Sequence, residues 1–265
     1  MNGSSIVLPF PLGEPVDELW EVLLDLGETN LPWTLIGGQM VLLHAVEYGT
    51  VPVVVSQDGD IIADIRAEPK SIKEIVALLQ DTGFELEGVN TDGVGHRYVR
   101  PGREGLPVKI DVLAPEGVGH KADLTTTKPG RTVQVPAGTQ LLNRTEQVTV
   151  IHGDRTGVVP RPTLLAAIVG KAAACKIIGE DNSRHYRDLA LLCSILEDPF
   201  STREGLGPKD LKRLSDVAEL LDPRHPAWTL VPPELRRDGQ DAFRVLCERP
   251  SPGTDSRDSH GQLLI

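Results

Sequence analysis

The stretch VVVSQDGDIIADIR, residues 53–66, sets two aspartates inside an apolar run that otherwise predicts a buried strand. An Asp-Gly pair usually marks an exposed turn, and that is the alternative interpretation. On a strand, residues two positions apart lie on the same face, so Asp58 and Asp60 would present neighbouring carboxylates while Gly59 faces away. Two like charges on a half-buried face repel each other unless a cation lies between them. The stretch therefore predicts a strand that carries a cation site.

A third aspartate extends this predicted site. In PVKIDVLAP, residues 107–115, apolar residues alternate on one face and place Asp111 on the opposite face of a neighbouring strand. Three carboxylates from two strands form the arrangement that two-metal phosphoryl or nucleotidyl transfer requires. Mg²⁺ suits such oxygen ligands and keeps open positions for phosphates. We therefore expect Asp58, Asp60 and Asp111 to bind two Mg²⁺ ions.

A Gly-Gly pair lies between a predicted strand, Trp33 to Ile36, and a helix predicted from Gln39 to about Tyr48. Glycines let a backbone approach a ligand closely, and a helix N-terminus holds phosphate oxygens. Gly37 and Gly38 are therefore candidate nucleotide-binding residues.

The remaining pattern predicts an α+β fold, in which a mixed sheet flanked by helices is followed by a helical domain. We expect domains at 1–158 and 159–249, followed by a flexible tail at 250–265. A first helix is expected within residues 14–28. The other elements predicted for the sheet domain are a strand from Val53, a helix at Ser71–Asp81, strands at Phe84–Glu87, His96–Arg100 and Val108–Leu113, and a hairpin across residues 152–154. In the helical domain, the first predicted helix is Leu164–Ile178, with Thr163 as its N-cap and Gly179 as its stop. Further helices are predicted at Ser183–Glu197, Lys209–Leu221 and Pro233–Cys247.

The charge of the 265-residue chain is −11 and is unevenly distributed. Residues 1–120 contain 7 Lys and Arg against 19 Asp and Glu, whereas residues 121–191 contain 10 against 6. The acidic total argues against nonspecific coating of nucleic acid, but the basic segment can hold phosphates. Its best candidates for binding RNA are Arg161, Lys171, Arg184 and Arg187.

The three cysteines have no paired spacing, the N-terminus lacks the features of a signal peptide, and no apolar run is long enough for a bilayer. We therefore expect a soluble cytoplasmic protein without a membrane partner.

The segments LIGGQMVLLH, SQDGD and VKIDVL together resemble the nucleotidyltransferases of the DNA polymerase β superfamily. Their spacing resembles the branch that contains the AbiEii-type abortive-infection toxins and the mycobacterial MenT-type toxins. PRPTLLAAIVGKAAACK and RHYRDLALL resemble its helical half, so the resemblance covers about residues 30–196. It implies a polymerase-β-like fold. It also implies metal binding by the three aspartates, Ser56 at the triphosphate, a cleft lined by Lys171 and Asp188, and a nucleotide-binding role for Arg184.

The implied reaction is Mg²⁺-dependent transfer of NMP from an NTP to a hydroxyl, with an RNA or tRNA 3′ end as acceptor. The implied biological role is that of a toxin restrained by an antitoxin. Two alternatives stay open. The acidic first 120 residues favour a small acceptor such as an aminoglycoside-like antibiotic. Val55 and Gly59, where the family often has an arginine and a branched apolar residue, favour a degenerate nucleotide-binding module without catalysis.

Lys171 follows Leu164 and Ile168 at helical spacing, on an apolar stripe. A lysine there either extends outward to water or contacts phosphate in the cleft, where it would be a catalytic residue. Lys176 is five residues further, about 140° around a helix, and is expected to point elsewhere. For Arg184 and Asp188, an ordinary i,i+4 helix pair is the alternative.

Overall fold

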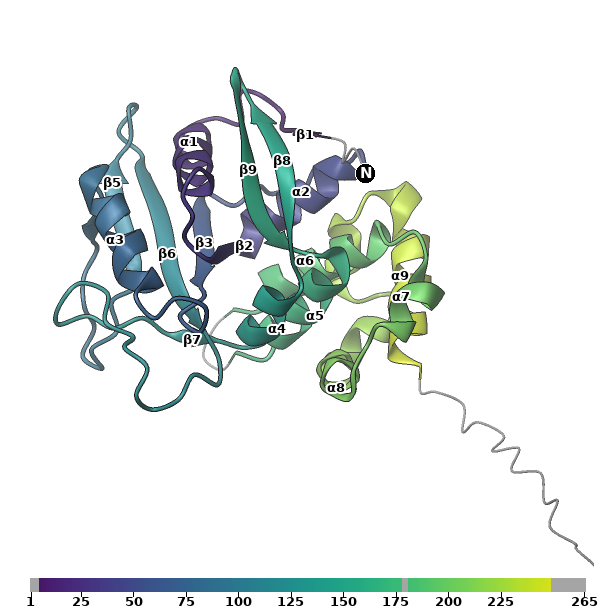
Figure 1. Ribbon diagram of the computed structural model, residues 1–265. Coiled ribbons are helices and arrows are strands. Elements are labelled where there is room, and N and C mark those ends of the chain that lie inside the picture. The colour runs from purple at the N-terminus through teal and green to yellow at the C-terminus, as the bar shows by residue number, and fades with distance from the viewer. Residues whose placement is uncertain (1–4, 178–180, 249–265) are drawn as a thin grey trace, which may run out of the picture.

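The computed structural model describes residues 5–177 and 181–248. The helix stop predicted at Gly179 and the tail predicted at 250–265 lie outside these residues. Figure 1 shows a part built on sheets beside a part built from helices, which is a mixed α+β architecture as predicted. The domain division at residue 158 stays a prediction. Within the described ranges, no helix combines the length and apolarity that a membrane crossing requires.

The larger sheet is mixed and has the strand order β2-β3-β6-β5-β4, with β7 paired to β6. β3 runs parallel to β6 and antiparallel to β2, and β5 is antiparallel to both β6 and β4. The strands are β2 (Trp33–Ile36), β3 (Asp58–Ala63), β4 (Glu85–Leu86), β5 (Arg97–Pro101), β6 (Pro107–Pro115) and β7 (Gln134–Val135).

Helices α1 (Val16–Gly27) and α3 (Ser71–Asp81) pack against this sheet. β3 packs closely against α1 because residue 59 is a glycine. A Cβ atom added at Gly59 would lie 2.8 Å from Leu19 Cδ1. Gly59 therefore faces the core, as the strand pattern predicts, and the residues on either side of it face the opposite side.

A smaller sheet of order β1-β8-β9 lies beside α2 (Gly37–Glu47). The predicted hairpin is confirmed, since β8 (Thr145–His152) and β9 (Arg155–Pro162) pair across residues 153–154, and β1 (Ile6–Val7) pairs with β8. His44 Nε2 of α2 lies 3.0 Å from the carbonyl oxygen of Pro162. Burial, followed by the charge of Arg161, lowers the pKa of His44 to about 3, so the contact joins neutral groups.

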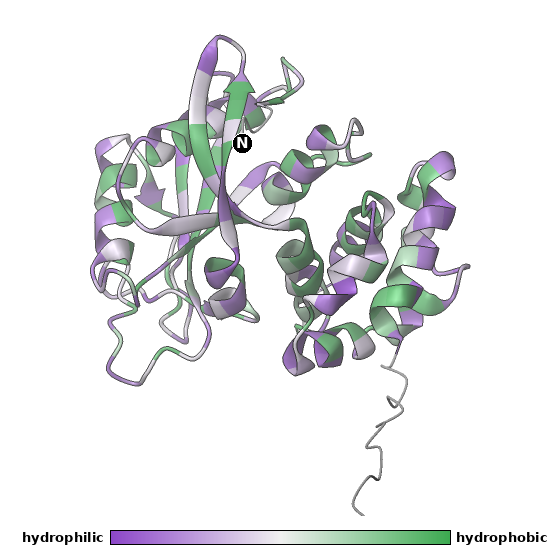
Figure 2. Cartoon of the chain, turned by 45° about the vertical axis from the view of Figure 1, so that its right-hand side comes forward, coloured by the Kyte–Doolittle hydropathy of each residue, from purple (hydrophilic) through white to green (hydrophobic). Residues whose placement is uncertain are grey.

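The helical part follows β9. Its elements are α5 (Leu164–Ala174), α6 (Ser183–Ser194), α7 (Pro199–Glu204), α8 (Pro208–Ser215), two 3₁₀ turns (Ala218–Leu221 and Pro226–Leu230) and α9 (Pro233–Cys247), while a short α4 (Gly138–Asn143) precedes the hairpin. In Figure 2 hydrophobic and hydrophilic residues alternate along these helices, as expected of helices that bury one side. The predicted helix at Lys209–Leu221 is split into α8 and a 3₁₀ turn. Thr163 is at the N-cap of α5, but its side chain makes no capping bond.

The prediction of a strand from Val53 is wrong. β3 begins at Asp58, where pairing with β6 starts at Lys109. The valines before it have no partner strand, and Val53 is 67% exposed. Apolarity alone suggested a strand, but a strand also needs a neighbour to satisfy its backbone.

Candidate functional site

Two of the predicted aspartates are cross-strand neighbours. Asp60 on β3 is paired with Asp111 on β6, and Asp58 is paired with Lys109. Asp58 and Asp60 share one face of β3 because a single residue separates them. The structure therefore brings all three carboxylates to one face of the sheet, opposite the face that Gly59 presents to α1.

Ionisation of the Asp60 carboxyl group is unfavourable in this site. Burial raises its pKa to about 7, and the carboxylate of Asp111 adds to this rise. The charges of Lys171 and Arg184 act in the opposite direction and come from the helical part. Among the described residues, Asp60 has no ion-pair partner within 4 Å. It is therefore an acidic group that a bound cation would stabilise.

Arg97 is a site residue that the sequence analysis missed. It lies on β5 directly opposite Asp111 and donates from Nε to Oδ1 and from Nη2 to Oδ2, each at 2.8 Å. The same Nη2 lies 3.6 Å from Asp58 Oδ2. A guanidinium thus occupies both oxygens of Asp111 and lies close to Asp58.

The bonds from Arg97 to Asp111 affect which of the predicted aspartates can bind a metal ion. Within residues 5–177 and 181–248, no group of three or more His, Cys, Asp or Glu side chains is placed so that it could hold a metal ion. Asp58 and Asp60 nevertheless fit Mg²⁺, since they offer hard oxygen ligands on one face and Asp60 has no ion-pair partner within 4 Å among the described residues. Asp111 fits as a third ligand only if Arg97 releases it, so this role stays a prediction.

The Gly-Gly pair lies directly against the aspartate strand. Gly37 has a φ of +69°, and a Cβ atom there would lie 1.8 Å from Asp60 Oδ2. A Cβ on Gly38 would lie 2.3 Å from Ser56 Cβ. Only glycine allows the first turn of α2 to come this close to both side chains. The N-terminus of α2 therefore opens beside Asp60 and Ser56, as expected for a phosphate-binding turn.

Gln39 holds the loop before β3 in place. Its Oε1 accepts a hydrogen bond of 3.0 Å from Trp20 Nε1, and its Nε2 donates to the Ser56 carbonyl at 2.6 Å. Gln39 is fully buried, so this link is protected from water. It fixes Ser56 at the rim of the site.

The helical wall carries a buried ion pair. Lys171 on α5 donates from Nζ to Oδ2 of Asp188 on α6 at 2.8 Å, and Arg187 Nε lies 3.6 Å from the other carboxylate oxygen. Lys171 and Asp188 are both largely buried. Asp188 is therefore paired with a residue of another helix, which sequence spacing cannot reveal.

These residues surround one cleft of about 1050 Å³. All nine predicted site residues line it, namely Gly37, Gly38, Ser56, Asp58, Asp60, Asp111, Lys171, Arg184 and Asp188. Further ionisable residues that line it are His96, Lys109, Lys176, His185 and Arg187. Carboxylates on the sheet thus face a cationic helical wall across a space large enough for a nucleotide.

The ammonium groups of Lys171 and Lys176 point to different partners, as expected. Both residues line the cleft, but Lys176 Nζ donates to Glu219 Oε1 at 2.8 Å, whereas Lys171 Nζ donates to Asp188. The expectation that Arg161 is available to bind RNA is wrong. Arg161 does not line the cleft and is 2% exposed. It forms ion pairs with Glu47 and Glu146 and so links α2 to β8.

A comparison of the sequence with models of known protein families gives no match, and a comparison with curated proteins gives no significant match. The geometry of the cleft is therefore the basis for inferring a function.

Proposed function

We propose that this protein is a Mg²⁺-dependent nucleotidyltransferase with a polymerase-β-like fold. The observation that carries the proposal is that nine residues, chosen from segments spread between positions 37 and 188, line one cleft with acidic and basic groups on opposing walls. Nucleotidyl transfer needs this division, because the metal ligands and the phosphate ligands must meet at one substrate.

Each wall has a separate task in this proposal. Asp58 and Asp60 hold the divalent cation, which when bound supplies electrostatic stabilisation of the phosphates. The first turn of α2 and Ser56 bind phosphate oxygens. Lys171 and Arg184 neutralise the triphosphate from the opposite side, and Asp188 keeps the Lys171 ammonium in position.

In the reaction, an acceptor hydroxyl loses its proton and forms a bond to the α-phosphorus of the NTP. The bond from that phosphorus to the bridging oxygen breaks, and pyrophosphate leaves. The resemblance to toxin nucleotidyltransferases favours an RNA or tRNA 3′ end as acceptor and a cognate antitoxin as partner. Lys109 and Arg187 support an RNA acceptor, because they add positive charge to the cleft.

One observation favours a second candidate function, a nucleotide-binding module without catalysis. Arg97 occupies both oxygens of Asp111, which is the third predicted metal ligand. If Arg97 never releases Asp111, the protein would bind nucleotide but not transfer it.

Incubation with each α-³²P-labelled NTP, Mg²⁺, total RNA and a panel of aminoglycosides distinguishes these functions. The proposal predicts label on RNA. Label on an aminoglycoside alone would support the small-molecule alternative. Nucleotide binding without label on any acceptor would support the module.

A further inference from the structure

Four charged residues form one row across the larger sheet. Asp60 on β3 pairs with Asp111 on β6, and Asp111 pairs with Arg97 on β5. Glu87 continues the row, since its N–H donates to the Arg97 carbonyl at 2.9 Å just beyond the pairing of Leu86 with Tyr98. Directly paired residues share a face of a sheet, so Glu87 lies on the same face as the aspartates.

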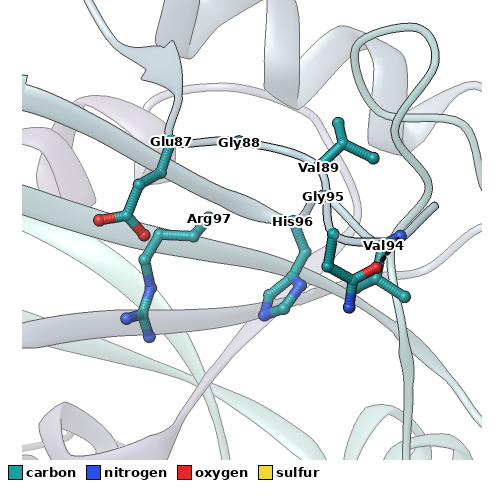
Figure 3. A pocket seen from close by; sticks show the side chains of 8 residues that line it. Glu87, Gly88, Val89, Val94, Gly95, His96 and Arg97 are labelled. Carbon is teal, nitrogen blue, oxygen red and sulfur yellow. Dashed lines mark hydrogen bonds between the residues drawn. The ribbon is translucent and has the colours of Figure 1, made fainter. Parts of the chain in front are cut away.

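The outer end of this row borders a second hollow of about 490 Å³. Its lining residues are Glu87, Gly88, Val89, Asn90, Val94, Gly95, His96 and Arg97. His96 also lines the main cleft, so this residue borders both spaces. Figure 3 shows the side chains of Glu87, His96 and Arg97 extending to the same side of the chain.

The loop around this hollow is held by its own hydrogen bonds. Asn90 Oδ1 accepts from the N–H groups of Asp92 and Val94 at 3.0 and 2.8 Å. Gly95 donates its N–H to the Arg131 carbonyl at 2.9 Å. A Cβ on Gly95 would lie 2.9 Å from the Gly88 carbonyl, so the loop closes tightly. The hollow is therefore preformed, and the Asn90 side chain keeps its amide nitrogen as a donor.

Glu87 has no ion pair or side-chain hydrogen bond with any residue in the described parts of the chain, and it is exposed. An ionised carboxylate only accepts hydrogen bonds, so its natural partner on a ligand is an N–H or O–H group. Val89 and Val94 give the hollow an apolar side against which a flat ring can pack.

The distance from Glu87 to Asp111 covers two strand spacings, about 10 Å. This is the length of a nucleoside from its sugar hydroxyl to the far edge of its base. A nucleoside whose hydroxyl lies near Asp111 therefore places its base in the hollow, with the base edge at Glu87.

We propose that this hollow binds the terminal base of the RNA acceptor, and that Glu87 accepts a hydrogen bond from an exocyclic amino group of that base. The inference rests on the proposed function and deepens it. Adenine, cytosine and guanine carry such an amino group, whereas uracil has none, and its N3–H donor lies between two carbonyl oxygens that a carboxylate repels. The site thus selects against acceptors that end in uridine.

The test uses the full-length protein and four RNA oligonucleotides that differ only in their 3′ nucleotide. The oligonucleotides carry fluorescein at the 5′ end, so binding is measured by anisotropy and transfer by label from an NTP. One hydrogen bond to a charged group predicts about tenfold weaker binding and slower transfer for the uridine end. In E87Q the amide can also donate, so the discrimination should fall to about twofold or less. The matched control E85Q, at an exposed residue of β4 outside the hollow, should keep the discrimination.

Equal use of all four ends by the natural protein, or undiminished discrimination by E87Q, overturns the inference while leaving the proposed function standing if label is transferred. Discrimination in binding without any transfer supports the base site and contradicts the proposed enzymatic function. Absence of both binding and transfer overturns both.

Discussion

Lys171 Nζ and Asp188 Oδ2 lie 2.8 Å apart between α5 and α6, and both residues are more than nine-tenths buried. A lysine on an apolar stripe predicts a buried charge without a partner, so its replacement by methionine should stabilise the empty protein. The ion pair reverses this expectation, because removal of the lysine leaves the Asp188 carboxylate buried, with Arg187 Nε at the longer distance of 3.6 Å.

Lys171→Met should therefore lower the free energy of unfolding by about 3–5 kcal/mol, the usual effect of breaking a buried pair. Denaturant unfolding measures this value. The double variant Lys171→Met, Asp188→Leu should recover most of the loss. Lys212→Met is the control: Lys212 is exposed and pairs with Asp216 at the surface, so the change should be below about 1 kcal/mol. A stable Lys171→Met protein would contradict the importance of the pair.

The stability of the metal-free protein should fall as pH rises from about 4 to 7. Burial and the Asp111 carboxylate raise the folded-state pKa of Asp60 to about 7, above the ordinary aspartate value of 3.8. The folded state therefore holds its proton more tightly, and this advantage is lost as pH passes through 7. Urea unfolding with a chelator should show a decrease on the order of 4 kcal/mol from this group.

The matched variant Asp60→Asn should lose most of this pH dependence and be the more stable protein at pH 8. Mg²⁺ should also flatten the profile of the natural protein, because a bound cation stabilises the ionised carboxylate. An unchanged profile in Asp60→Asn would show that another group causes the slope.

Gly37→Ala should both destabilise the protein and weaken nucleotide binding. Its Cβ would lie 1.8 Å from Asp60 Oδ2 at a φ of +69°. Gly49→Ala is a matched control, since Gly49 has a φ of +76° but nothing lies within 4 Å of an added Cβ. The control should show only the backbone effect, about 1 kcal/mol. The difference between the two free energies of unfolding isolates the clash, and equal values would contradict the close approach at Asp60.

RNA binding should weaken steeply with salt, because bound phosphates release counterions. Lys109→Gln should weaken binding and reduce the slope of log K against log salt by about 0.7, the value for one phosphate contact on a single strand, because Lys109 lines the cleft. Arg224→Gln should leave the slope unchanged, since Arg224 is 90% exposed, pairs with Asp222 and does not line the cleft. A slope independent of Lys109 would remove this residue from the RNA path.

Local periodicity predicted the elements that can be recognised from their own sequence, without knowledge of the elements they pack against. The apolar spacing at Ser71–Asp81 and Pro233–Cys247 gave the bounds of α3 and α9, and strand parity placed Asp58 and Asp60 on one face. The contact between Arg97 and Asp111 depends on the register of β5 against β6, which no local pattern contains.

The contacts in the helical wall of the cleft also could not be predicted from a local sequence pattern. Lys171 and Asp188 are 17 positions apart and meet only because α5 packs on α6. Lys176 lines the same cleft, but its ammonium pairs with Glu219, which is 43 positions further along the chain and which helical geometry could not identify.

Transfer of label from an α-³²P-labelled NTP to RNA, compared among three aspartate variants, tests the central claim most directly. Asp58→Asn and Asp60→Asn should each abolish transfer while the protein stays folded. Asp64→Asn should retain it, because Asp64 accepts hydrogen bonds from the N–H groups of Arg66 and Ala67 and does not line the cleft. Undiminished transfer by both Asp58→Asn and Asp60→Asn would contradict the assignment of this cleft as the active site.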